Sequence, residues 1–306
     1  MAFEFKKKES VRKAVRRLGR KGIEKALCSL EPCDRLESVH VARKDIKQLR
    51  ALLRLVRSAM PRSKYRRYSD TLREAAGHLA AARDAHVKLN ALRNLSAHFQ
   101  GKLAPRSFQK IKAILAADCR KQHGELSRTR APRRVARLLK KLSGRFSSLK
   151  LKDSGWSALG PGIKRIYRDG RCGHQLAQEN GIPENFHEWR KRVKDLYYQV
   201  GLLRPIWPEQ MSAAEAELKH LGECLGDDHD LFLLAEPDTL KLIRKQDEKE
   251  AEALEAVADQ RQKELRTEAL ALGARFYEEK PAVFCKRLRQ YWKRWRHEPK
   301  RAIRAA

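Results

Sequence analysis

The chain has 306 residues, and its 69 Lys and Arg against 38 Asp and Glu leave a formal net charge of +31. A chain of this length can bury a large core, but no fold requires so much self-repulsion, so the composition predicts a polyanionic partner. No apolar run of transmembrane length occurs, and we expect a soluble cytoplasmic protein without membrane insertion.

Nearly every segment shows the helical period and is rich in Leu, Ala, Arg, Lys and Glu, which predicts an all-α fold. The expected helices lie near residues 9–30, 38–60, 65–100, 105–123, 130–146, 158–180, 186–205, 210–235, 238–278 and 281–297. Breaks are expected at the turn 153–155 and at Pro32, Pro61, Pro105, Pro132, Pro161, Pro183, Pro208, Pro237 and Pro281.

Two of the expected helices carry nearly the same pattern. Residues 39–61 read VHVARKDIKQLRALLRLVRSAMP, and residues 186–208 read FHEWRKRVKDLYYQVGLLRPIWP. Both contain His, then Arg-Lys, Lys and Leu at matching positions, and both end at Pro. Because an apolar duplication would not need the matching cations, the repeated feature is a charged face.

Helical geometry places these cations on one side of each helix. In the first copy, one arc of about 80° collects the basic residues, and the opposite side carries the apolar residues of a bundle core. Ser38 and Asn185 are the expected N-caps of the two helices. The first arc holds His40, Arg43, Lys47, Arg50 and Arg54, flanked by Lys44; the second holds His187, Arg190, Lys194 and Tyr198, flanked by Lys191.

The duplication extends on both sides of these helices. Upstream, VRRLGRKG at 15–22 matches IKRIYRDG at 163–170, which pairs Arg16, Arg17 and Arg20 with Lys164, Arg165 and Arg168. Downstream, 79–84 matches 225–230, which pairs Asp84 with Asp230. The chain therefore divides near residues 151–159 into halves of about 5–150 and 156–298, which we expect to pack as two antiparallel four-helix-bundle-like halves.

These motifs resemble the CHAD domain, the conserved histidine α-helical domain. The resemblance rests on V-H-x-x-R-K-x-x-K, F-H-x-x-R-K-x-x-K, the Ala-Ala-Arg-Asp and Asp-His-Asp segments and the tail LGARFYEEKPAVFCKRLRQYW. It implies one domain over residues 5–298, with a pseudo-twofold and a central basic groove that binds inorganic polyphosphate. Relatives with a catalytic triphosphate tunnel carry a Glu-x-Glu-x-Lys strand, whereas AFEFK at 2–6 lacks the first Glu, so we expect a stand-alone, non-catalytic module. The resemblance also implies recruitment to polyphosphate granules.

Polyphosphate offers only charged oxygens, so its receptor needs many spaced cations and nothing on which to stack bases. Arg can grip neighbouring oxygens with its fork, and Lys acts as a flexible point charge. We expect each of the two motif histidines to donate a hydrogen bond to a phosphate oxygen. The predicted polyphosphate-binding residues are Arg16, Arg17, Arg20, His40, Arg43, Lys44, Lys47, Arg50, Arg54, Lys164, Arg165, Arg168, His187, Arg190, Lys191, Lys194 and Tyr198.

Each of these signals also has an ordinary structural interpretation. A basic stripe is often a solvated helix face, and His40 and His187 could be satisfied core residues. We expect Asp84 and Asp230 to orient Arg or Lys through ion pairs rather than to act as acids or bases. The basic stretch 128–145 could join the groove or form a separate contact.

Metal, cofactor and enzyme chemistry are not expected. His220 and Cys224 are four residues apart on a helix and could share a ligand, but the matching first-half residues, Glu74 and His78, would not rebuild that site. The six cysteines form no C-x-x-C pair and are expected as reduced thiols. No phosphate-binding glycine loop, G-x-S-x-G or H-E-x-x-H motif occurs.

Two functions therefore remain open. The first is polyphosphate binding without catalysis, and the alternative is sequence-nonspecific nucleic-acid binding, which the same charge would serve. Single-stranded nucleic acid usually requires aromatic rings among the basic residues, and the first stripe has none. A scaffold for anionic membranes is a weaker third reading, since no helix combines this charge with a recognisable exposed apolar face.

Overall fold

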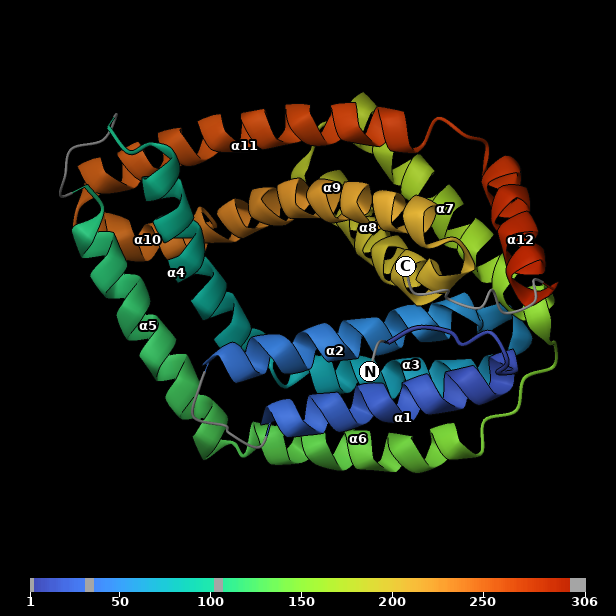
Figure 1. Cartoon of the computed structure of the whole chain (residues 1–306). Helices are drawn as coiled ribbons and strands as arrows, with labels where there is room; N and C mark the ends of the chain where they lie inside the picture. Colours follow the sequence, from blue (N-terminus) through green and yellow to red (C-terminus); the bar gives the residue numbers. More distant parts are fainter. Residues whose placement is uncertain (1–2, 31–35, 102–106, 298–306) are drawn as a thin grey trace, which may run out of the picture.

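The computed structural model describes residues 3–30, 36–101 and 107–297, and the regular structure in these ranges is entirely helical (Figure 1). The predicted all-α class is confirmed. The first half contains α1 (Val11–Leu30), α2 (Leu36–Leu55), η1 (Arg57–Ala59), α3 (Arg62–Gly77), α4 (Ala80–His98), α5 (Gln109–Arg128) and α6 (Ala131–Ser147). The second contains α7 (Gly155–Glu179), α8 (Pro183–Leu203), η2 (Arg204–Ile206), α9 (Pro208–Leu234), α10 (Pro237–Arg244), α11 (Glu248–Phe276) and α12 (Pro281–His297).

Each half is built on a bundle of four helices. In the first half α1, α2, α3 and α6 pack around one core, and in the second half α7, α8, α9 and α11 do so. Figure 1 shows the first bundle below the second. α4 leaves the first bundle and packs against α9, while α12 packs against α7. The bundles touch mainly through α2 with α8 and through α4 with α9.

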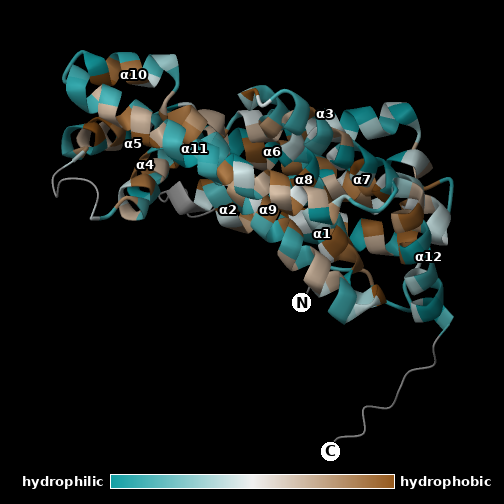
Figure 2. Cartoon of the chain, turned by 90° about the horizontal axis from the view of Figure 1, so that it is seen from above, coloured by the Kyte–Doolittle hydropathy of each residue, from teal (hydrophilic) through white to brown (hydrophobic). Residues whose placement is uncertain are grey.

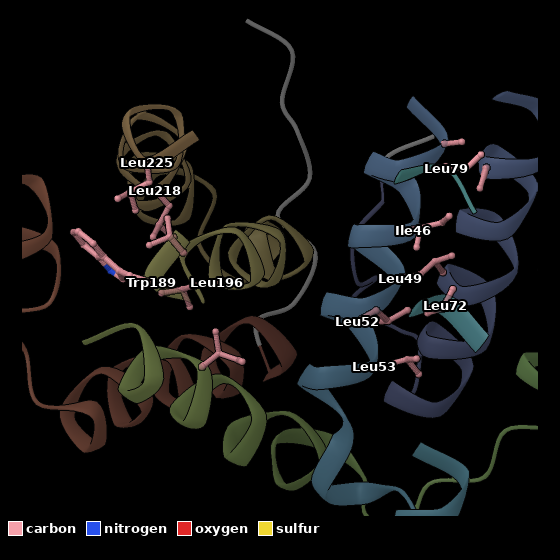
Figure 3. Close-up of a cluster of buried hydrophobic side chains, with 14 of the residues drawn as sticks. Ile46, Leu49, Leu52, Leu53, Leu72, Leu79, Trp189, Leu196, Leu218 and Leu225 are labelled. Atoms are coloured by element: carbon pink, nitrogen blue, oxygen red, sulfur yellow. The ribbon is translucent and has the colours of Figure 1, made fainter. Parts of the chain in front are cut away.

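The core of each bundle uses the apolar side of the two repeated helices. Ile46 and Leu49 of α2 are fully buried with Leu72 of α3, and Trp189 and Leu196 of α8 are fully buried in the second bundle (Figure 3). Brown and teal residues alternate along individual helices in Figure 2, as amphipathic helices require. With their apolar sides held in the two cores, α2 and α8 turn their basic sides away from those cores.

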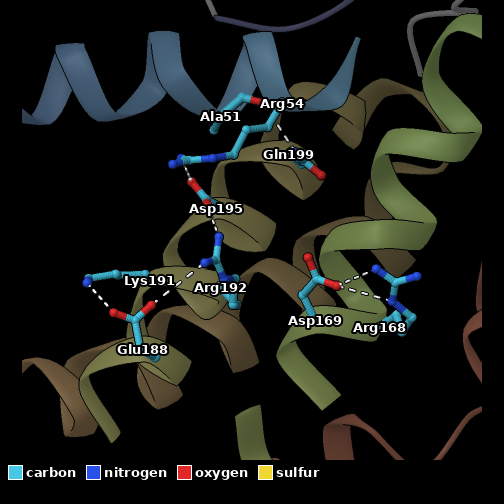
Figure 4. A network of polar contacts seen from close by, with 9 residues as sticks. All are labelled: Ala51, Arg54, Arg168, Asp169, Glu188, Lys191, Arg192, Asp195 and Gln199. Atoms are coloured by element: carbon cyan, nitrogen blue, oxygen red, sulfur yellow. Dashed lines mark hydrogen bonds and ion pairs between the residues drawn. The ribbon is translucent and has the colours of Figure 1, made fainter. Parts of the chain in front are cut away.

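Polar and backbone contacts join the two bundles where α2 meets α8. Arg54 Nη1 donates to Asp195 Oδ1 at 2.6 Å, and Gln199 Nε2 donates to the carbonyl of Ala51 at 3.2 Å (Figure 4). At the start of α7, Gly162 lies against the backbone of Leu55, so closely that a Cβ on Gly162 would fall 1.9 Å from the Leu55 oxygen. These contacts set the distance between the repeated helices.

The two halves differ at α9, because its counterpart in the first half is broken into two helices. α9 runs unbroken through Pro208–Leu234, whereas the matching first-half stretch is divided into α3 and α4 around residues 78–79. The single helix predicted over 65–100 is therefore wrong. The single helix predicted over 238–278 is also wrong, because α10 and α11 are separate helices there. The break turns α4 out of its own bundle and onto α9.

Three local predictions were also wrong. α7 continues through Pro161, because one lost backbone hydrogen bond is outweighed by the burial of the helix around it. Ser38 and Asn185 do not cap α2 and α8, since each helix begins two residues earlier. Asn185 Nδ2 instead donates to the carbonyls of Leu176 and Asn180 at the end of α7. The predicted boundary at 298 and the breaks at Pro32 and Pro105 lie outside the described residues.

Candidate functional site

A cavity of about 430 Å³ lies between the two bundles, where the basic sides of α2 and α8 face each other. α4 and α9 contribute one residue each. Nine of the lining side chains are cationic, and only two are acidic. The lining consists of Arg43, Lys47, Arg50, Arg54, Arg83, His187, Glu188, Arg190, Lys191, Arg192, Lys194, Asp195, Tyr198 and His229.

The α2 side of the cavity is fixed by contacts at both of its ends. Arg43 Nη1 donates to the carbonyl of Ala76 at 2.5 Å, which holds this guanidinium against the end of α3. Arg54, three turns further along, is held by Asp195 of α8. Lys47 and Arg50 project between these two anchored arginines and are half-buried. The α2 side is therefore a row of four cations, of which the outer two have fixed positions.

The α8 side carries both of the cavity's acids, and each is ion-paired. Glu188 contacts Lys191 Nζ at 2.5 Å and Arg192 at 3.7 Å. Asp195 contacts Arg54 at 2.6 Å and Arg192 at 3.9 Å (Figure 4). Both carboxylates are thus paired with Lys191, Arg192 and Arg54. The other cations that line the cavity have no ion pair with a carboxylate of α8.

Arg83 of α4 connects the two halves at the end of the cavity. Its Nη1 donates to Asp84 at 2.9 Å and its Nη2 to Asp230 of α9 at 3.2 Å. Both aspartates that were expected to orient a cation thus contact the same arginine, one from each half. This pairing fixes the position of Arg83 at the end of the cavity. Both aspartates are engaged by Arg83, so the other lining cations have few acidic partners.

Burial inside this cluster changes the titration of the central lysines. Desolvation, followed by the charges of Arg190, Arg83 and Arg43, lowers the pKa of Lys47 to about 7. Desolvation and Arg190 also lower the pKa of Lys194. The cavity is thus so positive and so poorly hydrated that it disfavours the protonated form of its own lysines. An anion placed there would reverse this effect.

Some hydrogen-bond donors around the cavity have no acceptor. Among the described residues, the Nε atoms of Arg43, Arg50 and Arg190 are buried without a hydrogen-bond partner. Buried donors of charged groups normally have partners, because leaving one unpaired is costly. Three such donors around one cavity favour a ligand rich in acceptor oxygens.

A histidine pair closes the α8–α9 side. The Nδ1 atoms of His187 and His229 lie 3.0 Å apart, so one ring donates and the other accepts. Burial and the cations Arg190 and Lys191 lower the pKa of His187, and burial and the same cluster lower the pKa of His229 to about 3. Both rings are therefore neutral near pH 7, and their Nε2 atoms are not used by this bond.

Both the sequence and the fold match a known family. The CHAD domain family model matches residues 20–237, which include both repeated helices and the whole lining of the cavity. The chain belongs to the CHAD family. The fold is also similar to the crystal structure of the CHAD domain from the plant Ricinus communis, with a TM-score of 0.58 and 17% identity, over 92% of this chain and 89% of that chain. No curated protein matches the sequence.

Within this CHAD domain, the cavity collects nine of the predicted binding residues but not His40 or Lys44. His40 lines a neighbouring cavity of about 590 Å³ together with His86 and Asp230. Lys44 is exposed beside the stripe and is absent from both linings. The two motif histidines therefore occupy different environments, although they hold equivalent positions in the repeat.

The basic residues of α1 and α7 do not reach the cavity, contrary to prediction. α1 and α7 pack on the apolar sides of α2 and α8, so a layer of core separates their cations from the groove. Arg20 and Lys164 are exposed. The other four have partners outside the cavity: Arg16 donates to the carbonyl of Leu149, Arg17 pairs with Glu9, Arg165 donates to Ser58 and Arg168 pairs with Asp169.

Five lining residues were not predicted as site residues: Arg83, Glu188, Arg192, Asp195 and His229. Arg83 and His229 occupy equivalent positions in the repeated segments 79–84 and 225–230, one residue before the paired aspartates, so comparing the repeats could have found them. Arg192 of the second repeat aligns with Asp45 of the first, and this difference in charge kept Arg192 out of the predicted basic stripe. None of the helices in the described part of the CHAD domain is long and apolar enough to cross a membrane.

Proposed function

We propose that this CHAD domain binds inorganic polyphosphate in the cavity between its two halves. The observation that carries the proposal is the set of nine cations on three helices against two acids, with three buried guanidinium Nε atoms lacking acceptors. A linear chain of phosphates supplies closely spaced anionic oxygens, and Arg and Lys bind such oxygens by charge-assisted hydrogen bonds. Recruitment to polyphosphate granules would follow from this binding.

Polyphosphate fits the cavity better than nucleic acid does. Tyr198 is the only Phe, Tyr or Trp in the described lining, so bases would find little aromatic surface on which to stack. A duplex, with a major groove alone about 12 Å wide, is too broad to enter a cavity of about 430 Å³. An unbranched phosphate chain has neither restriction.

Binding is proposed to occur without turnover. Hydrolysis of a phosphoanhydride would use a base to activate water, and both carboxylates of the lining are ion-paired, Glu188 with Lys191 and Asp195 with Arg54. Incubation with long-chain polyphosphate should therefore release no phosphate above the rate of the buffer. Release that disappears in a Glu188→Gln variant would contradict this part of the proposal.

The binding test is a titration with phosphate chains of increasing length on matched charge variants. Lys47→Glu, Lys194→Glu reverses two cavity lysines, and Lys140→Glu, Lys141→Glu makes the same change in net charge on exposed positions of α6. The cavity variant should weaken binding by about 100-fold or more, since each reversal removes a buried charge contact worth about 1.5–3 kcal/mol. The α6 variant should bind nearly as wild type.

Competition with duplex DNA distinguishes the two candidate functions. At about 150 mM salt, where the screening length is about 8 Å, polyphosphate should remain bound when duplex DNA is added at equal phosphate concentration. Displacement by the duplex, or equal weakening by the α6 and cavity variants, would show that binding depends on general surface charge and would favour the nucleic-acid function.

A further inference from the structure

Away from the cavity, three potential metal ligands meet where α9 packs against α11. His220 and Cys224 are one turn apart on the same side of α9, and Glu268 of α11 lies opposite them. His220 and Glu268 are exposed, whereas Cys224 is buried beneath them. The sequence suggested only the first two residues; Glu268 is 44 positions beyond Cys224 and is brought to them by the fold.

The distances between the three donor groups are short enough for one metal ion. One imidazole nitrogen, the Cys224 sulfur and one carboxylate oxygen all lie within 4.8 Å of one another, and His220 Nε2 is 2.9 Å from Glu268 Oε1. With bonds of about 2.0–2.3 Å, ligands of a tetrahedral ion stand about 3.5 Å apart. Small rotations of exposed side chains would bring these atoms to that spacing.

The cluster lies at a firmly held contact between α9 and α11. Glu268 reaches the cluster from α11, and Asp227 lies about one turn beyond Cys224 on α9. The helices on either side of the cluster are already joined by the Arg275–Glu217 and Arg266–Asp228 ion pairs. The cluster therefore joins two helices whose relative position is already fixed.

We propose that His220, Cys224 and Glu268 bind a borderline divalent transition metal, Zn²⁺ foremost, and so link α9 to α11. Imidazole nitrogen, thiolate sulfur and carboxylate oxygen are the ligands that Zn²⁺ prefers, and a water would complete four-coordination. The thiol transfers its proton to solvent when the metal–sulfur bond forms, so the thiolate and the carboxylate balance the charge of the ion. Binding tightens as pH rises, because this proton must leave.

The two halves offer an internal comparison. Glu74 of α3 and His78, the residue after α3, occupy the equivalent positions, with His78 Nε2 4.0 Å from Glu74 Oε1, but no thiol accompanies them. His98 of α4 contacts Glu264 of α11 at 3.0 Å, one turn of α11 from Glu268 and again without a thiol. These two pairs have the imidazole and the carboxylate of the proposed site but lack the sulfur.

The test is titration of the full chain with Co²⁺ alone, without polyphosphate, and then displacement by Zn²⁺. Wild type should develop the thiolate-to-cobalt charge-transfer absorption and release one proton per ion. Cys224→Ser should abolish the absorption, and His220→Gln or Glu268→Gln should weaken binding by about tenfold or more. His98→Gln and Cys119→Ser, which remove the control imidazole and another buried thiol, should leave the absorption unchanged.

Three results would overturn the metal site: no charge-transfer absorption in wild type, an absorption that persists in Cys224→Ser, or one that is insensitive to Glu268→Gln. Circular dichroism shows whether Cys224→Ser is folded, and Glu268→Gln changes an exposed residue, so it serves as the decisive variant if the serine variant unfolds. The polyphosphate proposal is unaffected by either outcome, because none of the three ligands lines the basic cavity.

Discussion

At the scale of single residues, Lys47 carries the clearest sign that the cavity is prepared for an anion. It is desolvated and surrounded by Arg190, Arg83, Arg43 and Lys194, and these conditions lower its pKa to about 7. A lysine in an ordinary solvated stripe would remain fully charged at that pH. The basic stripe of α2 is therefore more than a solvated helix face.

Polyphosphate affinity should fall as pH rises above about 7. Bound phosphate favours the protonated form of Lys47, whereas the free protein loses that proton in this range. Isothermal titration between pH 6.5 and 9 should show the fall in wild type and a flatter profile in a Lys47→Arg, Lys194→Arg variant, since arginine does not titrate there. Equal slopes in the two proteins would exclude the lysines as the cause.

The stability of the ligand-free protein should change with pH in the opposite direction. Because the pKa of Lys47 is lowered by folding, the unfolded chain binds more protons between about pH 7 and the ordinary value of 10.5. The free energy of unfolding should therefore rise with pH across this window, by at most about 1.4 kcal/mol per pH unit from one group. Urea denaturation of wild type and Lys47→Met measures this slope, which the variant should reduce.

At the scale of helices, the cavity depends on how closely the two bundles approach. The start of α7 passes directly over the end of α2, and Gly162 makes this possible because it has no side chain. Nearby, the Arg54–Asp195 ion pair and the Gln199 hydrogen bond to Ala51 join α2 to α8. The separation of the two basic stripes is thus set by close packing beside them.

Gly162→Ala should destabilise the protein by about 3 kcal/mol, because the new methyl group would overlap the Leu55 backbone, which cannot move aside as a side chain could. Gly124→Ala in α5 is the matched control. Its Cβ meets nothing within 4 Å, and the change should stabilise the helix by about 0.5–1 kcal/mol. Thermal or urea denaturation compares the two variants; equal effects would mean that the α7–α2 contact is looser than described.

At the scale of the whole molecule, positive charge is not confined to the cavity. The stretch 128–145 forms the end of α5 and most of α6, which packs on α1 and α3 rather than on α2. Arg133, Arg137 and Lys140 are exposed there. This stretch is therefore separated from the cavity by the core of the first bundle and does not join the main groove.

Polyphosphate should stabilise the fold as a unit, since the cavity draws its lining from both halves. A ligand that binds only the folded state at 100 times its Kd adds about 2.7 kcal/mol to the free energy of unfolding. Long chains should therefore raise Tm in one cooperative transition, with orthophosphate at equal phosphate concentration giving a much smaller shift. Separate transitions for the two halves in the presence of long chains would contradict a ligand held between them.

Much of the architecture could be read from the sequence because it depends on local periodicity. Ile46, Leu49 and Leu53 recur on one side of their helix and are buried, and the cations between them are directed away from that core. The offset between the repeats separated the chain into its two bundles. Helix boundaries were less predictable: α7 continues through Pro161 because the surrounding residues of the helix are buried, which no local pattern records.

The sequence by itself determined two amphipathic helices with matching cationic sides, since the side on which a residue lies follows from helical geometry alone. Only the tertiary structure decided which cations share a cavity. A helical pattern specifies the direction in which a side chain points but not the neighbour that it meets there. Arg83 and Arg192 therefore line the cavity, whereas Arg17 and Arg168 pair with acids elsewhere. The same reason brought Glu268 to His220 and Cys224, which local spacing could not foresee.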